Sequence, residues 1–336
     1  MEKRNIALVY DLRKDYLDMG YSEDDVAEFD SESTIASLEE AIRGLGYEVD
    51  RVGHGRALCQ RLVAGERWDL VFSIAEGLKG RSREAQVPAL LEMFEQPYAF
   101  SDPLVCAVTL DKEVAKKIVR QSRVPTADFV LIRPGEPVKG LPFPFPVFAK
   151  PVAEGTGKGI DGRSRVDGPG ELKNTVERLI NVYDQPVLVE EYLPGREFTT
   201  GILGTGGEAH ALGTLEVIVK AGAPSRDYTY EVKEKCEEFV DYVRPADPEV
   251  CREVEDVALR AYLALDCRDA GRVDIRLDGE GRPNFLEVNP LPGLHPYHSD
   301  LPMIATSVGM SYRDLLGNII ENAFRRQEKG HVASSR

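Results

Sequence analysis

Apolar residues in the first third of the chain follow two alternating patterns. Strands are expected at 6–10 and 69–74, which are mostly apolar, and at 47–52, where apolar and charged residues are mixed. Apolar residues at helical spacing separate these strands, at 33–45 and 58–64, and a further helix is expected at 86–94. This alternation of strand and helix predicts a small parallel sheet with helices on its faces.

The rest of the chain predicts a mixture of helices and strands around two irregular stretches. Helices are expected at 111–121, 170–183 and 249–265, and strands at 147–150, 187–191, 198–203 and 211–218. Residues 134–146 are rich in Pro and Gly, which predicts a loop. Residues 221–245 are charged and lack clear periodicity, and a long irregular segment inside a compact protein is often a functional loop.

Polar residues gather on one face of a predicted hairpin at 271–290. Arg272, Asp274 and Arg276 share a face of the first strand, and Glu287 and Asn289 share a face of the second. The opposite face is apolar on both strands, with Val273, Ile275, Leu286 and Val288. Two carboxylates and an amide oxygen suit Mg²⁺, especially Mg²⁺ that already holds nucleotide phosphates. The alternative is a surface hairpin whose charges face water.

Composition narrows the class of protein. A chain of 336 residues is expected to form two or three domains. Its 42 Lys and Arg against 57 Asp and Glu give a net charge of −15. This charge argues against a nucleic-acid or anionic-membrane surface, although a nucleotide needs only a local basic pocket.

Cysteine usage and hydropathy point to the cytoplasm. The five cysteines are scattered and form no Cys-x-x-Cys pair, so a zinc ribbon or a thioredoxin-like site is not expected. Free thiols in a reducing cytosol explain them most simply. The first apolar run is too short for a signal peptide, and no segment has the roughly 18 apolar residues that a bilayer span requires.

A glycine-rich loop follows the strand expected at 147–150. Lys150 ends the strand, and the stretch from Glu154 through Gly155, Thr156 and Gly157 lets backbone N–H groups approach phosphate oxygens. It is not a Walker A loop, because the first glycine and the Ser or Thr after the lysine of that motif are missing. An ordinary flexible turn is the alternative.

Other charged residues lie where they could meet a nucleotide. Glu190 and Glu191 end a hydrophobic strand, where they could accept hydrogen bonds from adenine or ribose, or simply be solvated. Lys112 and Lys116 share one face of a helix, a position that is usually solvated. His295 and His298 are expected in an acceptor pocket or surface loop rather than at zinc, since no third soft ligand is near in sequence.

Taken in order, these segments resemble the ATP-grasp superfamily, and within it the D-alanine–D-alanine ligases. The matching segments cover most of the chain: 111–112, 150–157, 189–199, 271–274 and 286–293. The resemblance implies an ATP-grasp fold of mixed α/β and α+β character. It implies an N-terminal parallel-sheet domain (1–108), a central subdomain with the glycine-rich loop (109–200), a C-terminal subdomain with the metal site (201–326) and a frayed tail (327–336).

The resemblance also implies a reaction and an ATP site. ATP would phosphorylate a carboxylate, and an amine would attack the acylphosphate to give an amide. Lys112 and Lys150 would hold the α- and β-phosphates. Glu190, Glu191 and Leu193 would line the adenine, and Glu197 would bind the ribose. The full set implied for ATP is Lys112, Lys150, Glu154, Gly155, Gly157, Glu190, Glu191, Leu193 and Glu197.

Metal and catalytic roles follow from the same resemblance. Two Mg²⁺ ions, for which Mn²⁺ can substitute, would be held by Asp274, Glu287 and Asn289. Thr156 would belong to the loop lid, and Lys233 in the irregular segment would reach the γ-phosphate. Arg272 and the backbone N–H of Gly293 would stabilise the oxyanion of the tetrahedral intermediate.

The half of the site expected to bind amino acids departs from the family pattern. The implied substrate residues are Glu28, Glu76, Gly77 and Ser299, of which Ser299 matches only with a one-residue insertion. The family's His-Gly reads Glu76-Gly77 here, and Glu234 replaces a tyrosine. An anion in place of a titratable neutral group favours a substrate with an extra positive charge, or a different first substrate.

The expected function is therefore an ATP-dependent carboxylate–amine ligase, most like a D-alanine–D-alanine ligase. The alternatives are a ligase for another amino-acid or small-molecule pair, or a non-catalytic ATP-binding regulator. Amino-acid-like small molecules are the expected partners, with no nucleic acid and no membrane. A homodimer is expected by resemblance only.

Overall fold

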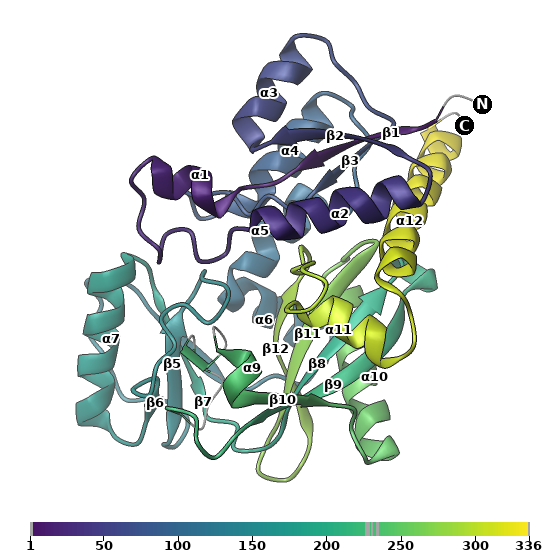
Figure 1. Cartoon of the computed structure of the whole chain (residues 1–336). Coiled ribbons are helices and arrows are strands. Elements are labelled where there is room, and N and C mark those ends of the chain that lie inside the picture. The colour runs from purple at the N-terminus through teal and green to yellow at the C-terminus, as the bar shows by residue number, and fades with distance from the viewer. Residues whose placement is uncertain (1–2, 226–228, 230, 233–234, 335–336) are drawn as a thin grey trace.

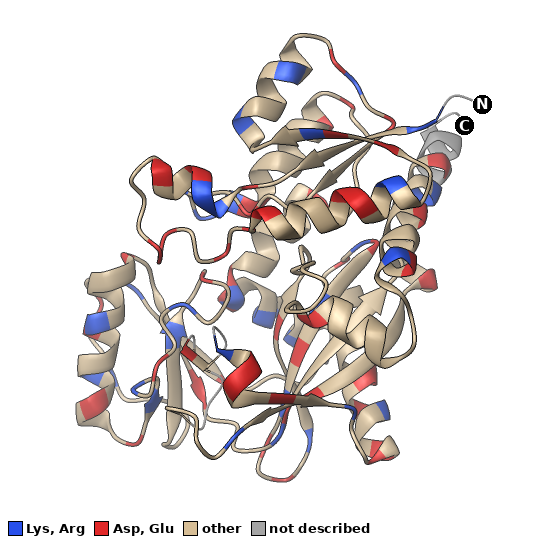
Figure 2. Cartoon of the chain, viewed as in Figure 1, with Lys and Arg blue, Asp and Glu red and all other residues tan. Residues whose placement is uncertain are grey.

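Three sheets make up the protein in a computed structural model, which describes residues 3–225, 229, 231–232 and 235–334 (Figure 1). The first sheet lies at the top of the view, the second at the lower left, and the third at the lower right. Acidic and basic residues are interspersed along the elements of all three layers (Figure 2). In the described part of the chain, none of the helices combines the length and apolar character that crossing a membrane requires.

The first sheet is the predicted parallel one. Its strand order is β2 (Glu48–Gly53), β1 (Asn5–Val9) and β3 (Leu70–Ser73), and both pairings are parallel. Its helices are α1 (Arg13–Asp18), α2 (Glu32–Gly44), α3 (Gly55–Val63) and α4 (Gln86–Met93). A short 3₁₀ turn at Arg83–Ala85 precedes α4, and α5 (Pro103–Leu110) leads away from the sheet. Of these helices, α1 and α5 were not predicted.

The last helix returns to the first layer. Helix α12 (Tyr312–Ser334) packs against α2, and Leu316 and Ile319 join one core with Ile35 and Leu38. Burial of this apolar stripe explains why the helix forms. It continues to Ser334 through residues that were expected to be a frayed tail.

The second sheet carries the glycine-rich loop. It is antiparallel, in the order β4 (Phe129–Ile132), β7 (Val187–Glu191), β5 (Val147–Pro151) and β6 (Arg165–Val166). Helix α7 (Pro169–Tyr183) covers one face, and α6 (Lys112–Gln121) precedes the sheet in sequence. The loop connects β5 to β6, so the end of β5 fixes where it begins.

The third sheet carries the hairpin. All its pairings are antiparallel, in the order β10 (Val240–Val243), β9 (His210–Val219), β8 (Glu197–Leu203), β11 (Ala270–Leu277) and β12 (Pro283–Asn289). Its helices are α9 (Cys236–Phe239), α10 (Pro248–Ala264) and α11 (Asp300–Ser307). Gly201 faces α11 while its neighbour Ile202 packs with α10, so the two helices cover opposite faces.

The predicted boundary between residues 200 and 201 falls inside β8, and the whole strand belongs to the third sheet. The irregular segment predicted at 221–245 includes α9 and β10 among its described residues.

Candidate active site

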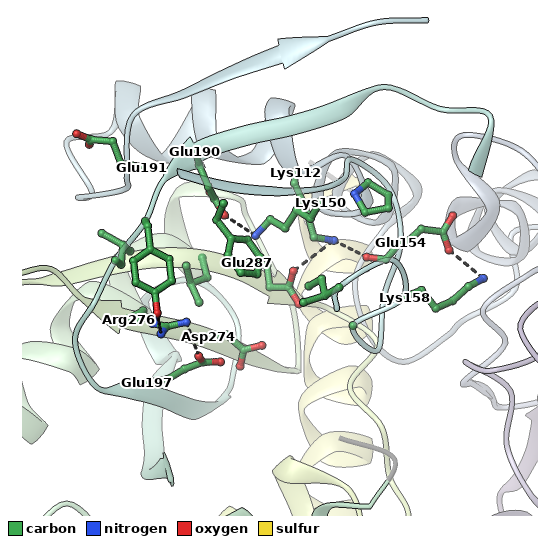
Figure 3. A pocket seen from close by; sticks show the side chains of 17 residues that line it. Lys112, Lys150, Glu154, Lys158, Glu190, Glu191, Glu197, Asp274, Arg276 and Glu287 are labelled. Atoms are coloured by element: carbon green, nitrogen blue, oxygen red, sulfur yellow. Dashed lines mark hydrogen bonds and ion pairs between the residues drawn. The ribbon is translucent and has the colours of Figure 1, made fainter. Parts of the chain in front are cut away.

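A pocket lies between the second and third sheets. Its walls come from β5, β7, β11 and β12 and from the glycine-rich loop (Figure 3). The lining residues include most of the predicted ATP site: Lys112, Lys150, Glu154, Gly157, Glu190, Glu191, Leu193 and Glu197. The metal candidates Asp274 and Glu287 line the same pocket.

Two lysines and a glutamate form a buried cluster at the back of this pocket. Glu190 lies 2.7 Å from Lys150 Nζ and 2.8 Å from Lys116 Nζ, and all three side chains are buried. Burial alone would raise the pKa of Glu190, but the attraction of the two ammonium groups outweighs it and lowers that pKa to about 2. The Glu190 carboxylate therefore holds the lysines, a role that the sequence interpretation did not include.

Lys116 is the candidate functional residue that sequence reasoning missed most clearly. Its side chain is fully buried and donates to Thr126 Oγ1 at 2.8 Å, whereas the side chain of neighbouring Lys117 is 61% exposed. The expectation that Lys116 is solvated is wrong. The available signal was its place between Ala115 and Val119 on the buried face of α6.

Lys112 connects the loop to the hairpin. It is the first residue of α6, after Asp111, whose carboxylate caps the helix by accepting from the Val114 N–H. Its Nζ donates to the backbone oxygen of Glu154 at 2.5 Å and lies 3.3 Å from Glu287 Oε2. Figure 3 shows Lys112 between these two acids, where it can meet phosphate oxygens from either side.

The hairpin brings its polar residues together as predicted. Arg272 pairs with Asn289 across the strands, and Asp274 pairs with Glu287. The alternative of a hairpin with charges facing water is wrong, because these residues line cavities between layers.

A β-bulge changes one detail of that hairpin. Asp274 pairs with Glu287 but the next residue, Ile275, pairs with Phe285, so Leu286 has no partner in the register. Leu286 lines the nucleotide pocket beside Glu287. The expectation that it lies on the opposite face with Val288 is wrong, because the period of two assumes an unbroken ladder.

The donor set of the hairpin fits a Mg²⁺ ion shared with a nucleotide. Asp274 and Glu287 supply carboxylate oxygens and Asn289 an amide oxygen. The buried Asn289 Nδ2 has no hydrogen-bond partner among the described residues, so this end of the amide is open to a ligand. No group of three His, Cys, Asp or Glu side chains in the described ranges could hold an ion alone. Mg²⁺ commonly takes one or two carboxylates and completes its shell with phosphates and water.

Aromatic and aliphatic groups line the other end of the pocket. Tyr192 stacks against Phe148 at 6.4 Å between ring centres, and the Arg276 guanidinium lies 5.2 Å from the Tyr192 ring. Arg276 also lies 3.3 Å from Glu197. Glu191 lies away from the other labelled acids in Figure 3, and its carboxylate accepts from the Asp128 N–H. This end offers a flat apolar slot of the kind that a purine fills.

A second cavity lies behind the nucleotide pocket. The two share Lys112, Glu154 and Glu287. Other predicted residues that line it are Glu28, Glu76, Gly155, Thr156, Arg272, Asn289, Gly293 and Ser299. Residues from all three layers thus meet here. Glu84, Asp300 and His298 also line this cavity, and the sequence interpretation had not assigned a role to Glu84 or Asp300.

Two predicted substrate residues have structural partners. Gly77 N–H donates to Asp11 at 2.9 Å, and a Cβ at Gly77 would lie 2.7 Å from the Arg83 backbone oxygen, so this glycine permits a close approach. Ser299 Oγ accepts from the His295 N–H at 2.9 Å. The predicted γ-phosphate residue, Lys233, lies outside the described residues.

Arg272 is held by two acids at the floor of the second cavity. It pairs with Asp300, the first residue of α11, and donates to Asp274 at 2.9 Å. Thr199 Oγ1 donates to the same Asp274 at 2.9 Å. The guanidinium is therefore fixed in orientation, as a group that stabilises a developing oxyanion must be, and Gly293 lines the same cavity.

Glu28 joins the first layer to the glycine-rich loop. Its carboxylate accepts from the Gly155 N–H at 2.7 Å and pairs with Arg83 at 2.8 Å. Arg83 in turn donates to the backbone oxygen of Ala153 at 2.9 Å. Burial opposes ionisation of Glu28, but the guanidinium prevails and lowers the pKa of this carboxyl.

Comparison with known proteins identifies the family. The family model described as "D-ala D-ala ligase C-terminus" matches residues 118–321, and a D-alanine–D-alanine ligase of Bordetella petrii is 36% identical over 85% of each chain. The chain belongs to the D-alanine–D-alanine ligase family. The predicted ATP-grasp resemblance is confirmed, and so is the class of enzyme, an ATP-dependent ligase that forms amide bonds.

A relative that is not named as a ligase also resembles this chain in sequence, and solved structures share its fold. The uncharacterized protein y4sG of Sinorhizobium fredii is 34% identical over 88% of each chain. The ligase of Bacillus anthracis solved with ATP aligns with a TM-score of 0.74 at 24% identity, covering 97% of this chain and 99% of that one. This likeness confirms the predicted ATP-grasp fold.

Proposed function

We propose that this chain uses ATP to phosphorylate the carboxylate of one amino-acid substrate and joins the acyl group to the amine of a second. The observation that carries the proposal is the meeting of the two cavities at Lys112, Glu154 and Glu287. At this junction, a substrate carboxylate in the second cavity would reach the γ-phosphate of an ATP bound in the first pocket. Proximity of this kind supplies much of the catalysis in phosphoryl transfer.

The residues divide the work by position. Lys112 and Lys150, which line the first pocket, would place their ammonium groups at the nucleotide phosphates. Arg272 and the Gly293 N–H would stabilise the tetrahedral oxyanion when the amine attacks. Asp274, Glu287 and Asn289 would hold the Mg²⁺ ions, two of which are expected, with Mn²⁺ as a substitute. When bound, such ions neutralise charge on the transferring phosphoryl group.

The test is release of ADP and phosphate from Mg·ATP with single amino acids and pairs, followed by mass spectrometry of the products. D-Alanine comes first, because it is the substrate in the names of the relatives. Turnover that yields an amide supports the proposal. Tight ATP binding with no turnover across the amino-acid panel would contradict it and favour a non-catalytic regulator.

A cytoplasmic location and a homodimer belong to the same proposal. The five cysteines are free thiols, as a reducing compartment requires. Light scattering of the purified protein would test the dimer.

A further inference from the structure

Six acidic side chains line the second cavity: Glu28, Glu76, Glu84, Glu154, Glu287 and Asp300. Four of them pair with a cation of the chain itself. The pairs are Glu28 with Arg83 at 2.8 Å, Glu154 with Lys158 at 3.0 Å, Glu287 with Lys112 at 3.3 Å, and Asp300 with Arg272. The protein thus balances four of these charges internally.

Glu76 and Glu84 are the two that form no ion pair among the described residues, and Arg83 attracts both only from a greater distance. Neither carboxylate forms a hydrogen bond or an ion pair with any described residue. Glu76 lies three residues beyond β3, at the carboxyl end of the parallel sheet, where ligands commonly bind. Burial raises the pKa of both carboxyls, to about 7 for Glu84. Neighbouring acids raise these pKa values too, whereas the attraction of Arg83, and for Glu84 also that of Lys112, lowers them in part.

Other buried polar groups of the same cavity also lack partners. Thr156 Oγ1 and Asn289 Nδ2 are buried, line the cavity and have no hydrogen-bond partner among the described residues. Buried polar atoms in folded proteins are nearly always satisfied, so such atoms around one cavity indicate a polar ligand.

We propose that one substrate is an amino acid with a second ammonium group, a diamino acid, whose two ammonium groups are bound by Glu76 and Glu84. This inference rests on the proposed ligase function and specifies its substrate class. A neutral amino acid brings only one ammonium, so one of the two carboxyls would have no cation to pair with and would stay protonated. A diamino acid brings two ammonium groups, one for each carboxylate.

A metal ion explains these two carboxylates less well. No group of three His, Cys, Asp or Glu side chains in the described part of the chain is arranged to hold an ion. Glu76 and Glu84 also come from the first layer, whereas the predicted Mg²⁺ ligands come from the hairpin of the third. An ammonium group needs only hydrogen-bond acceptors, which two carboxylates and Thr156 Oγ1 provide.

The experiment compares matched amino acids in the ADP-release assay with the full-length enzyme and Mg·ATP. Each diamino acid is set against its neutral isostere, in both enantiomers: 2,4-diaminobutyrate against norvaline, ornithine against norleucine, and 2,3-diaminopropionate against 2-aminobutyrate. Each is offered alone and with D-alanine. We expect at least one diamino acid to exceed its isostere in kcat/KM by about tenfold or more, the scale of a buried charge pair.

The variants Glu76→Gln and Glu84→Gln locate the effect. Each should raise the KM for the diamino acid by about tenfold or more while leaving the affinity for ATP unchanged, and the double variant should favour the neutral isostere. A variant that merely failed to fold would not change its preference in this way. Glu253→Gln, an exposed position on α10, makes the same charge change elsewhere and should leave all constants within about twofold.

The outcomes separate the two proposals. Equal or better turnover of the neutral isosteres by the unmodified enzyme would overturn the diamino-acid inference and leave the ligase function in place. A preference for diamino acids that survives in the double variant would overturn it as well. An enzyme that releases no ADP with any amino acid would overturn both.

Discussion

The buried cluster of Glu190, Lys116 and Lys150 has one more cation than anion. This excess positive charge is what can attract a phosphate. A neutral buried pair would hold Lys150 against Glu190 and leave little attraction for a phosphate. With two lysines on one carboxylate, the cluster has a net positive charge beside the first pocket when both ammonium groups are protonated, although burial lowers the pKa of Lys116. We therefore propose that Lys116 acts on ATP through Glu190, as a positioning residue.

This role predicts the behaviour of Lys116→Met, which keeps the length of the side chain but removes its charge. We expect the KM for ATP to rise about tenfold with a smaller change in kcat, and stability to fall by about 3 kcal/mol as the Glu190 cluster loses a cation. Lys117→Met is the matched control on the exposed side of α6, and its constants should stay near those of the unmodified protein. Steady-state kinetics and urea unfolding measure both, and equal effects of the two variants would contradict the role.

Single substitutions in the hairpin test whether Asp274 and Glu287 bind Mg²⁺. Asp274→Asn and Glu287→Gln keep the shape of each side chain but weaken its binding of Mg²⁺, so turnover should fall by at least about 10²-fold while the melting temperature changes little. Glu280→Gln, in the exposed turn of the same hairpin, should have no such effect. Near-normal kinetics of Asp274→Asn and Glu287→Gln together would rule out these ligands.

The glycine-rich loop shows how one element depends on a residue from another layer. Gly155 has room only for hydrogen, because a Cβ would lie 2.6 Å from Glu28 Oε1, the atom that accepts from the Gly155 N–H. Gly162, farther along the same connection, has nothing within 4 Å of that position. We call the contact between Glu28 and the Gly155 N–H the clamp on the loop. A substitution at Gly155 tests this clamp, whereas the same substitution at Gly162 tests only the flexibility of the loop.

Alanine at each glycine gives a direct comparison. Gly155→Ala should displace the Glu28 carboxylate and the start of the loop, and raise the KM for ATP by about tenfold. Gly162→Ala should change it by less than about twofold, since the added methyl meets open space. Isothermal titration with a non-hydrolysable ATP analogue would measure both affinities, and similar losses in the two variants would argue against the clamp.

Periodicity predicted most of the elements, but it failed where contacts between elements decide the local structure. The strands of the first sheet and the hairpin were placed within one or two residues, because their burial patterns are regular. The bulge at Leu286 was missed because it breaks that regularity. Asp300 could not be assigned to Arg272 from sequence, since their contact depends on how α11 docks against the hairpin.

At the scale of the whole molecule, charge in the first layer couples stability to pH. Asp30 lies just before α2, and its pKa is raised to about 7, first by burial and then by the neighbouring Asp11. The unfolded chain ionises this carboxyl near pH 3.8, so between that pH and about 7 the folded state binds more protons than the unfolded state. Asp30 must then reduce stability progressively as the pH rises through this window, and the cost is complete above it.

Asp30→Asn should remove that cost while its amide oxygen can still accept from Thr34. We expect the variant to be more stable than the unmodified protein at pH 8 by on the order of 1–2 kcal/mol, less than the full shift converts to because water reaches part of the side chain, and to be nearly equal at pH 4. Asp24→Asn makes the same charge change at an exposed neighbouring site and should show no such pH dependence. Urea unfolding at both pH values measures the difference, and a variant that is less stable than the unmodified protein at pH 8 would mean that Asp30 is ionised and satisfied in the folded protein.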